Sequence, residues 1–406
     1  MDNAVTIVTI KEIIPLYKGT DVASKVELVT FEENGFHVVS QKNLYTTGDL
    51  AVFIIPDYCI SYIPLFEEFI APNGDPSKSY LGKIGGVPKR IRAKKFNLSI
   101  EESGLPVYSN GILLPLKEVS LYLKTTPEAI LKRQSTNPGW LTVELGITKY
   151  EEPEEVVNQH GLNTKGGKPF PSGVYKTDET NINLLWGHIE KQLCYPLILR
   201  GTEKIDGSSI TIGVTDEYPK GFIASRNLLK PLTIKKVIGQ RDKTFLEKLK
   251  FWKKYDLNLY EESENTDDFV KYGKKYLDLM LQVGLHNVIL RGELNGGSIK
   301  GSGNKNNPAS GKEPNILFFN ADTFSNGVAV KMEALDFIEL CNKWGIPGVP
   351  HCFTAEFSSR EDIEDECAKY FEQCKKNKRI IEGIVLTTLD NTFSAKFMND
   401  EYDSKK

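Results

Sequence analysis

A short charged turn between two β-prone runs is the most informative part of this sequence. It reads Leu197-Ile198-Leu199-Arg200-Gly201-Thr202-Glu203-Lys204-Ile205-Asp206-Gly207-Ser208-Ser209-Ile210-Thr211-Ile212. Residues two apart on an extended segment point to the same face, so the Lys204 amine and the Asp206 carboxylate are expected to share one site. Gly207 would let the backbone approach a bulky ligand. The pattern suits a lysine that attacks a nucleotide α-phosphate beside a metal-binding carboxylate, and a surface hairpin with a charged pair is the plainer alternative.

Further charged motifs follow in a fixed order. They are Ser225-Arg226-Asn227, Arg291-Gly292-Glu293, Glu382-Gly383-Ile384-Val385-Leu386 and Ser394-Ala395-Lys396-Phe397. Hard divalent cations prefer oxygen ligands, so Asp206, Glu293 and Glu382 are the candidate metal ligands. Arg226 and Lys396 suit phosphate groups, although each alone would be an ordinary solvated cation. A lysine has an ordinary pKa near 10.4, and a cationic, partly desolvated pocket with a metal ion beside Lys204 would lower that pKa.

One aromatic residue is chosen to contact the nucleotide base. Phe319, in the run Asn315–Asp322, is expected to lie against the adenine, and a core strand position explains this phenylalanine at least as well. The glycine-rich segment Gly296–Asn304 is flexible by composition and would either fold over substrate phosphates or form a plain surface loop.

Together these motifs resemble the covalent nucleotidyltransferase superfamily of polynucleotide ligases and mRNA capping enzymes. Further matches extend the similarity over nearly the whole chain, to ATP-dependent RNA ligases with an N-terminal OB domain. They are Gly48–Ile54, Lys89–Lys95, Ser109–Leu116, Leu145–Tyr150 and Lys176–Glu179.

The resemblance implies a reaction and its participants. ATP would adenylylate Lys204, the AMP would pass to an RNA 5′-phosphate, and a 3′-OH would then displace AMP, with Mg²⁺ or Mn²⁺ as cofactor. Glu203 and Lys176 would join Arg226, Glu293, Phe319 and Lys396 in binding the nucleotide. Ser394 stands where many members of this group have a lysine, which puts one phosphate contact in doubt.

Composition sets the limits for the whole chain. The 406 residues, with 40% hydrophobic and 26% charged content, suit a globular protein of two or three domains. No apolar run approaches the roughly 20 residues of a membrane helix, so an intracellular protein without membrane contact is expected. The net charge of −3 gives no overall basic footprint, so any nucleic-acid contact must be local. The six cysteines lack ligand spacing, and Cys367 and Cys374 are expected to be reduced core residues.

The predicted fold class is α+β. Residues 1–125 carry short β-rich runs typical of a small OB-like barrel that binds nucleic acid, 126–172 read as a polar connector, and 173–406 form the nucleotidyltransferase domain, with antiparallel sheets and flanking helices. The basic cluster Lys89–Phe96 either follows a phosphate backbone or guards a strand edge.

Four helices are expected in the second domain. They span Thr244–Tyr255, Phe269–Val283, Met332–Trp344 and a segment opened by a capping box of Ser358 with Glu361.

Two other functions remain open beside RNA ligation. One is a DNA ligase of the same superfamily, which is disfavoured because only 406 − 396 = 10 residues follow Lys396, too few for the C-terminal OB domain of such enzymes. The other is a non-catalytic RNA-binding protein on a ligase scaffold, disfavoured because Lys204 and its companion charges are all kept. The expected partner is RNA, most simply a nicked duplex bound by a monomer.

Overall fold

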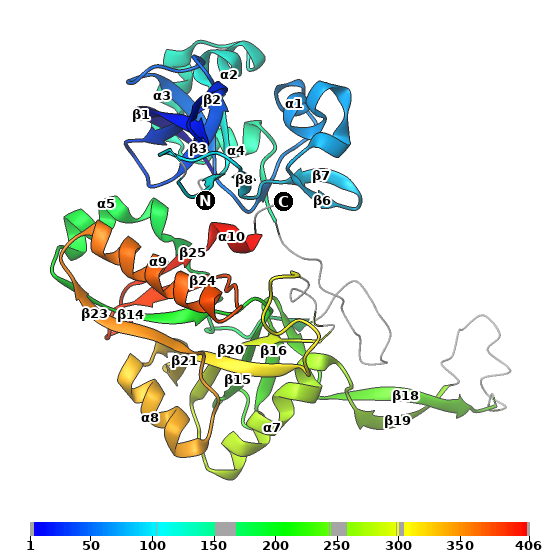
Figure 1. Cartoon of the computed structure of the whole chain (residues 1–406). Coiled ribbons are helices and arrows are strands. Elements are labelled where there is room, and N and C mark those ends of the chain that lie inside the picture. Colours follow the sequence, from blue (N-terminus) through cyan, green and yellow to red (C-terminus); the bar gives the residue numbers. More distant parts are fainter. Residues whose placement is uncertain are drawn as a thin grey trace.

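The computed structural model divides into an N-terminal β-rich part and a C-terminal part with two sheets (Figure 1). It describes residues 4–102, 104–150, 168–242, 244, 258–297, 299 and 304–403. The strands pair almost entirely antiparallel, and helices are fewer than strands, which confirms the α+β class. In the described part of the chain, the helices are all too short or too polar to cross a membrane.

The N-terminal part is built on a curled sheet with the strand order β10-β4-β1-β2-β3. Its strands are β1 (Val5–Lys18), β2 (Asp21–Phe31), β3 (His37–Gln41), β4 (Leu50–Ile54) and β10 (Ile112–Pro115). The β1–β2 register shifts at two places, and such bulges bend a strand and increase its twist. The long first pair therefore curls around Val8, Phe31 and Phe53, which form one core.

Smaller strands extend this domain. A second sheet contains β11 (Thr148–Lys149), β5 (Tyr58–Cys59), β7 (Val87–Arg90) and β6 (Gly82–Ile84), and β8 (Lys94–Phe96) pairs with β9 (Val107–Ser109). The helices are α1 (Glu67–Ile70), α2 (Leu116–Tyr122), α3 (Pro127–Thr136) and α4 (Trp140–Glu144). The basic cluster predicted from the sequence thus lies on β7, β8 and the turn between them.

The segment expected to connect the domains is largely packed against the first one. Ile130 of α3 and Trp140 and Leu141 of α4 are buried in the same core as Val5 and Ile54. Their apolar side chains explain this packing, which the polar composition of the segment obscured. We therefore propose to place the domain boundary after Tyr150; the expected connector from 151 to 167 lies outside the described residues.

The C-terminal part stacks two sheets between layers of helices (Figure 1). The larger sheet contains, in order, β12 (Lys168–Pro169), β17 (Leu228–Lys230), β16 (Phe222–Ser225), β15 (Ser208–Val214), β20 (Val288–Asn295), β21 (Asn315–Ser325) and β22 (Val328–Lys331). Helices α7 (Asp268–Gln282) and α8 (Ala334–Trp344) bury Tyr276, Met280 and Phe337 against one face. The opposite face of this sheet faces the second sheet.

The second sheet has the order β13-β25-β24-β14-β23. Its strands are β13 (Thr180–Asn181), β25 (Ser394–Met398), β24 (Gly383–Thr387), β14 (Leu197–Lys204) and β23 (His351–Phe357). Helix α9 (Arg360–Lys376) covers its outer face, and Cys367 and Cys374 are buried there as free thiols, as predicted. The remaining elements include α5 (Trp186–His188), α10 (Asp400–Asp403) and a projecting ribbon of β18 (Thr233–Gln240) and β19 (Asn258–Glu264).

Two of the predicted helices, α7 and α8, are confirmed, and α8 ends at Gly345 in the left-handed conformation. The predicted capping box of α9 is wrong by one residue. Ser359 is the N-cap and accepts a hydrogen bond from the Asp362 N–H, while the Asp362 carboxylate accepts one from the Ser358 N–H. Apart from Thr244, the helix predicted for Thr244–Tyr255 lies outside the described residues.

Candidate active site

The charged turn identified in the sequence is the corner where the chain passes from one sheet to the other. Strand β14 ends at Lys204 in the smaller sheet, and β15 begins at Ser208 in the larger one. A Cβ atom on Gly207 would lie 2.4 Å from the carbonyl oxygen of Leu294 on β20. A neighbouring strand therefore requires the glycine, and the close approach of a ligand to Gly207 stays a prediction. This corner places Lys204 between the two sheets.

Lys204 forms an ion pair with Glu382. The Nζ atom lies 2.7 Å from Oε1, and the two side chains are 24% and 16% exposed. Glu382 directly precedes β24, whose Gly383 pairs with Lys204 across the sheet. The second carboxylate oxygen of Glu382, Oε2, is buried and has no hydrogen-bond partner among the described residues.

Two further carboxylates act on this pair. Burial alone would lower the pKa of Lys204, but Glu382 first, then Glu293 and Asp206, raise that pKa above its ordinary value. Burial raises the pKa of Glu293 to about 8; Lys204 opposes this increase, while Glu382 and Asp206 add to it. The protein's own residues thus surround a protonated lysine with carboxyl groups. A cationic field at Lys204 would therefore have to come from a bound metal ion, and a lowered pKa of Lys204 stays a prediction.

The three predicted metal ligands all lie near Lys204, but their side chains do not form a complete set of metal ligands. Within the described ranges, no three His, Cys, Asp or Glu side chains are arranged to hold a metal ion by themselves. The buried and unpartnered Glu382 Oε2 and the three carboxyl groups near one lysine nevertheless fit a hard divalent cation, which would favour the charged form of Glu293. Mg²⁺ in particular commonly uses one or two carboxylates and completes its shell with water and substrate phosphates.

The predicted phosphate-binding cations converge on Asp178. Arg226, in the turn after β16, has its Nη2 atom 3.1 Å from Asp178 Oδ2, and Lys149 of the N-terminal domain contacts the same oxygen at 2.5 Å. Burial would raise the pKa of Asp178, but Lys149, Lys396 and Arg226 hold it below its ordinary value. Lys176 lies beside this group and donates a hydrogen bond to Asn227.

The side chain of Glu203 does not lie with those of Lys204, Glu293 and Glu382. Successive residues of a strand point to opposite faces, so its side chain faces α9 while Lys204 faces the other sheet. The carboxylate is 3% exposed and accepts hydrogen bonds from Tyr370 at 2.9 Å and from Arg379 Nη2 at 2.6 Å. The side chain anchors α9 and the segment after it, and a role of Glu203 in nucleotide binding stays a prediction.

Phe319 lies at an irregularity of β21. Arg291 pairs with Asn320 and Gly292 with Phe318, so Phe319 is left over as a bulged residue. Its neighbour Phe318 is fully buried and packs against Tyr276, whereas Phe319 stays half-buried. The core role is thus taken by Phe318, and contact of Phe319 with adenine stays a prediction.

Sequence reasoning missed two contributors to this site. Asp57, on the loop between β4 and β5, is held at a low pKa by Arg90 despite its burial, and Lys396 and Lys204 add to the effect, so the N-terminal domain reaches the pocket. Tyr402 of α10 donates a hydrogen bond to Asp206. Both partners are distant in the chain, and no local pattern marks them. Asp178, by contrast, lies inside the motif that begins at Lys176.

Comparison with known proteins agrees with this architecture. A family model described as RNA ligase matches residues 199–399. A mutant of Naegleria gruberi RNA ligase without ligand shares the fold with a TM-score of 0.65 at 20% identity, covering 98% of this chain and 97% of that chain. The same ligase with PPi gives a TM-score of 0.66 at 20% identity, with 99% and 98% coverage. Among curated protein sequences, no match is found. The matched region runs from β14 to the end of β25 and contains Lys204, Glu293 and Glu382, so through its C-terminal domain this chain is an enzyme of the RNA ligase family.

Proposed function

We propose that this protein joins RNA 3′-OH and 5′-phosphate ends with ATP, through an AMP adduct on Lys204. The observation that carries the proposal is the half-buried Lys204 amine at the corner between two sheets, 2.7 Å from Glu382 and within the field of Glu293 and Asp206. A surface hairpin would not bury an amine among three carboxylates. A non-catalytic RNA-binding module would not need this excess of charge, which costs stability unless a substrate or cation offsets it.

The related ligase supports the use of nucleotide and metal. Mutants of Naegleria gruberi RNA ligase are described with ATP and Mn and with AMP and Mn. The substitutions named for that ligase fall on a lysine and an aspartate two residues apart, and on a glutamate and a lysine fourteen residues apart. Lys204 with Asp206, and Glu382 with Lys396, have the same spacings here.

The first step would transfer AMP to the protein. A neutral Lys204 Nζ attacks the α-phosphorus of ATP, the nitrogen–phosphorus bond forms, and the bond to the pyrophosphate oxygen breaks. Glu382 Oε1 is placed to receive the proton that the amine must lose. Asp206, Glu293 and Glu382 would hold Mg²⁺ or Mn²⁺, which supplies positive charge to offset the charge of the α-phosphate.

The next two steps would use the same pocket for the RNA. A 5′-phosphate oxygen attacks the adducted phosphorus and releases Lys204, and the 3′-OH then attacks the activated 5′-phosphate and releases AMP. Arg226, Lys396 and Lys176 are the cations available for phosphate groups, and a phosphate would have to replace Asp178 at Arg226. Phe319 would contact the adenine.

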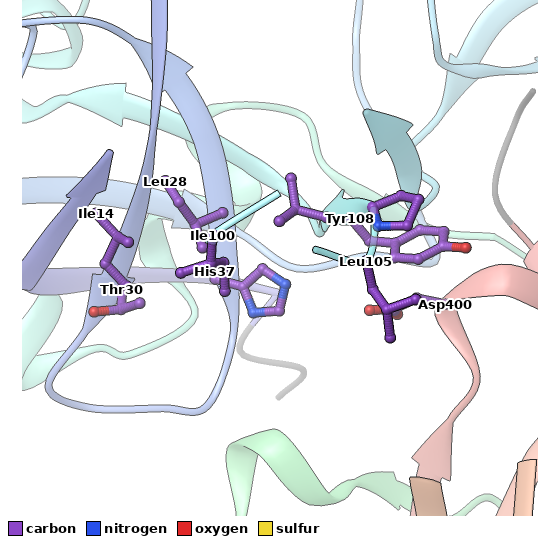
Figure 2. Close-up of a pocket in the computed structure, with 10 residues that line it drawn as sticks. Ile14, Leu28, Thr30, His37, Ile100, Leu105, Tyr108 and Asp400 are labelled. Atoms are coloured by element: carbon purple, nitrogen blue, oxygen red, sulfur yellow. The ribbon is translucent and has the colours of Figure 1, made fainter. Parts of the chain in front are cut away.

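The N-terminal domain provides the surface for the RNA. Lysines and aromatic rings alternate on it: Lys89 lies over Tyr62, Lys94 over Tyr80 and Phe96, and Lys95 over Tyr108. Such alternation lets cations contact the phosphate backbone beside rings that can contact bases or sugars. A shallow cavity of about 380 Å³ lies next to Tyr108 and is lined by His37, Leu105 and Asp400 (Figure 2). We expect a monomer that contacts a nicked duplex with this face.

Covalent labelling tests the proposal. Incubation with ATP labelled at the α-phosphate and Mn²⁺ should label the protein, and Lys204→Ala should abolish labelling. Lys369→Ala is the matched control, because Lys369 is 77% exposed on α9 and lies outside the pocket. Labelling that persists in Lys204→Ala would refute the assignment of the nucleophile, and an unlabelled wild-type protein would favour the non-catalytic alternative.

A further inference from the structure

Helix α10 connects the pocket to the N-terminal domain. It lies between the two domains (Figure 1) and carries Tyr402, which is 3% exposed. The Tyr402 hydroxyl donates a hydrogen bond to Asp206 Oδ2 over 2.5 Å. We propose that Tyr402 is a positioning residue for Asp206, and that α10 makes this positioning depend on the docking of the N-terminal domain. The inference rests on the proposed role of Asp206 as a metal ligand.

The hydrogen bond from Tyr402 would fix which oxygen of Asp206 faces the pocket. A hydrogen bond from a hydroxyl to a carboxylate is short, with about 2.5–2.7 Å between the two oxygens, and is stronger than a hydrogen bond between neutral groups. With Oδ2 bound to Tyr402, the Asp206 side chain is restrained in rotation. Residues that orient a metal ligand in this way often affect metal affinity about 10–100-fold.

Both partners of this hydrogen bond are themselves held in place. The carbonyl oxygen of Tyr402 accepts hydrogen bonds from the side-chain amides of Asn304 and Asn306, at 3.2 and 2.8 Å. Asn307 Nδ2 donates to the main-chain carbonyl of Asp206 at 2.9 Å. A segment after β20 therefore supports Tyr402 and Asp206 together, which leaves the hydroxyl little freedom to move.

The other end of α10 is bound to the N-terminal domain. Asn110 Nδ2, in the turn between β9 and β10, donates a hydrogen bond to Asp400 Oδ2 at 2.9 Å. Asp400 also lies in the field of His37 and beside Tyr108 at the cavity on that domain (Figure 2). Between these contacts, Glu401 pairs with Lys375 of α9 at 3.0 Å. A movement of the N-terminal domain would thus reach Asp206 through two residues of one helical turn.

Tyr402→Phe tests the local part, because it removes only the hydroxyl. Mn²⁺ binding is measured on the full chain with AMP by the loss of the free-Mn²⁺ electron paramagnetic resonance signal, and adenylylation is measured over a range of Mn²⁺ concentrations. Mn²⁺ affinity should fall about tenfold, and adenylylation should recover at high Mn²⁺. The control is Tyr45→Phe, another tyrosine buried to 4% exposure, whose hydroxyl has no partner in the described structure.

The outcomes separate this inference from the proposed function. If the wild type is labelled by ATP but Tyr402→Phe binds Mn²⁺ as tightly as Tyr45→Phe, the positioning role is refuted and the function stands. If adenylylation by Tyr402→Phe is low at every Mn²⁺ concentration and the melting temperature falls, the tyrosine is structural and the inference is again refuted. An unlabelled wild-type protein would refute the function instead.

Asn110→Ala tests the dependence on the N-terminal domain, because the Asn110 side chain donates a hydrogen bond to Asp400 at the start of α10, whereas Asp206 contacts Tyr402. Mn²⁺ affinity should fall about threefold, in the same direction as for Tyr402→Phe and by less, because Glu401 and the asparagines still hold the helix. Asn97→Ala, at an exposed asparagine of the same domain, is the control. Equal Mn²⁺ affinity in the two alanine variants would overturn the coupling between the domains.

Discussion

Two ion pairs of the C-terminal domain have the same length and opposite surroundings. In each, nitrogen and oxygen are 2.7 Å apart: Lys204 with Glu382, and Arg291 Nε with Asp322. Asp322 receives a second hydrogen bond from Tyr175, Arg291 donates another to Thr211, and both charged side chains are almost completely buried. Each pair keeps one buried polar atom without a partner in the described structure, Glu382 Oε2 and Arg291 Nη2, so the difference lies in the further carboxyl groups of Glu293 and Asp206 beside Lys204.

The difference separates a structural pair from the pair that we propose to be reactive. Arg291 and Asp322 balance each other, and the Tyr175 ring covers the guanidinium at 4.6 Å, so the pair has little to gain from a ligand. The pocket of Lys204 has more carboxylates than cations, and a cation or a transferred phosphoryl group would relieve that imbalance. Distance alone does not reveal function, whereas the charge that remains unbalanced around the pair does.

The largest expected effect is on folding and tests this distinction directly. Arg291→Met leaves Asp322 buried without its charge partner and should lower the free energy of unfolding by about 3–5 kcal/mol. Lys204→Met should lower it by only about 1 kcal/mol or less, because water reaches both partners. Urea unfolding of the two variants measures the difference. Equal losses would show that the two pairs are both structural.

Substitution of the carboxylates near Lys204 should affect activity strongly and stability little. Asp206→Ala, Glu293→Ala and Glu382→Ala are each expected to reduce strand joining about 100-fold, because each removes a ligand for the cation while relieving charge repulsion in the fold. Their melting temperatures should stay near that of the wild type. Sealing of a nicked RNA duplex is the measurement, with Glu366→Ala on α9 as the control. If all three variants seal normally, the cation binds elsewhere.

A smaller effect is expected at Asp178, which forms ion pairs with Arg226 and Lys149. Asp178→Asn removes the charge that ATP phosphates must displace, so the ATP concentration for half-maximal adenylylation should fall roughly threefold. Initial rates of labelling over a range of ATP concentrations measure this change. A rise in that concentration would mean that Asp178 helps to place the cations, and the carboxylate would then be a supporting residue.

The sequence predicted which charged residues gather around Lys204 better than it predicted the contacts that hold them in place. Lys204, Asp206, Glu293 and Glu382 stand out because their types and order follow a chemical requirement. The bond from Tyr402 to Asp206 joins residues 196 positions apart, and no local pattern predicts it. The contacts of the Glu203 side chain with α9 were not predicted, because neighbouring residues of a strand face opposite sides of the sheet. The packing of Trp140 and Leu141 against the first domain was not predicted, because they are two apolar residues in a polar segment.

The last prediction concerns the RNA surface. Arg90 pairs with Asp57 near the pocket, so a clean test of RNA binding should leave it in place. The double variant Lys89→Glu and Lys95→Glu should weaken binding to a nicked duplex about tenfold and lower the salt dependence by roughly two phosphate contacts. Lys369→Glu with Lys376→Glu on α9 changes the net charge equally and should bind as the wild type does. Labelling of Lys204 by ATP should be unchanged in both, since neither alters the pocket. Weakened labelling with unchanged duplex affinity would show instead that this face of the N-terminal domain contributes to nucleotide binding rather than to RNA binding.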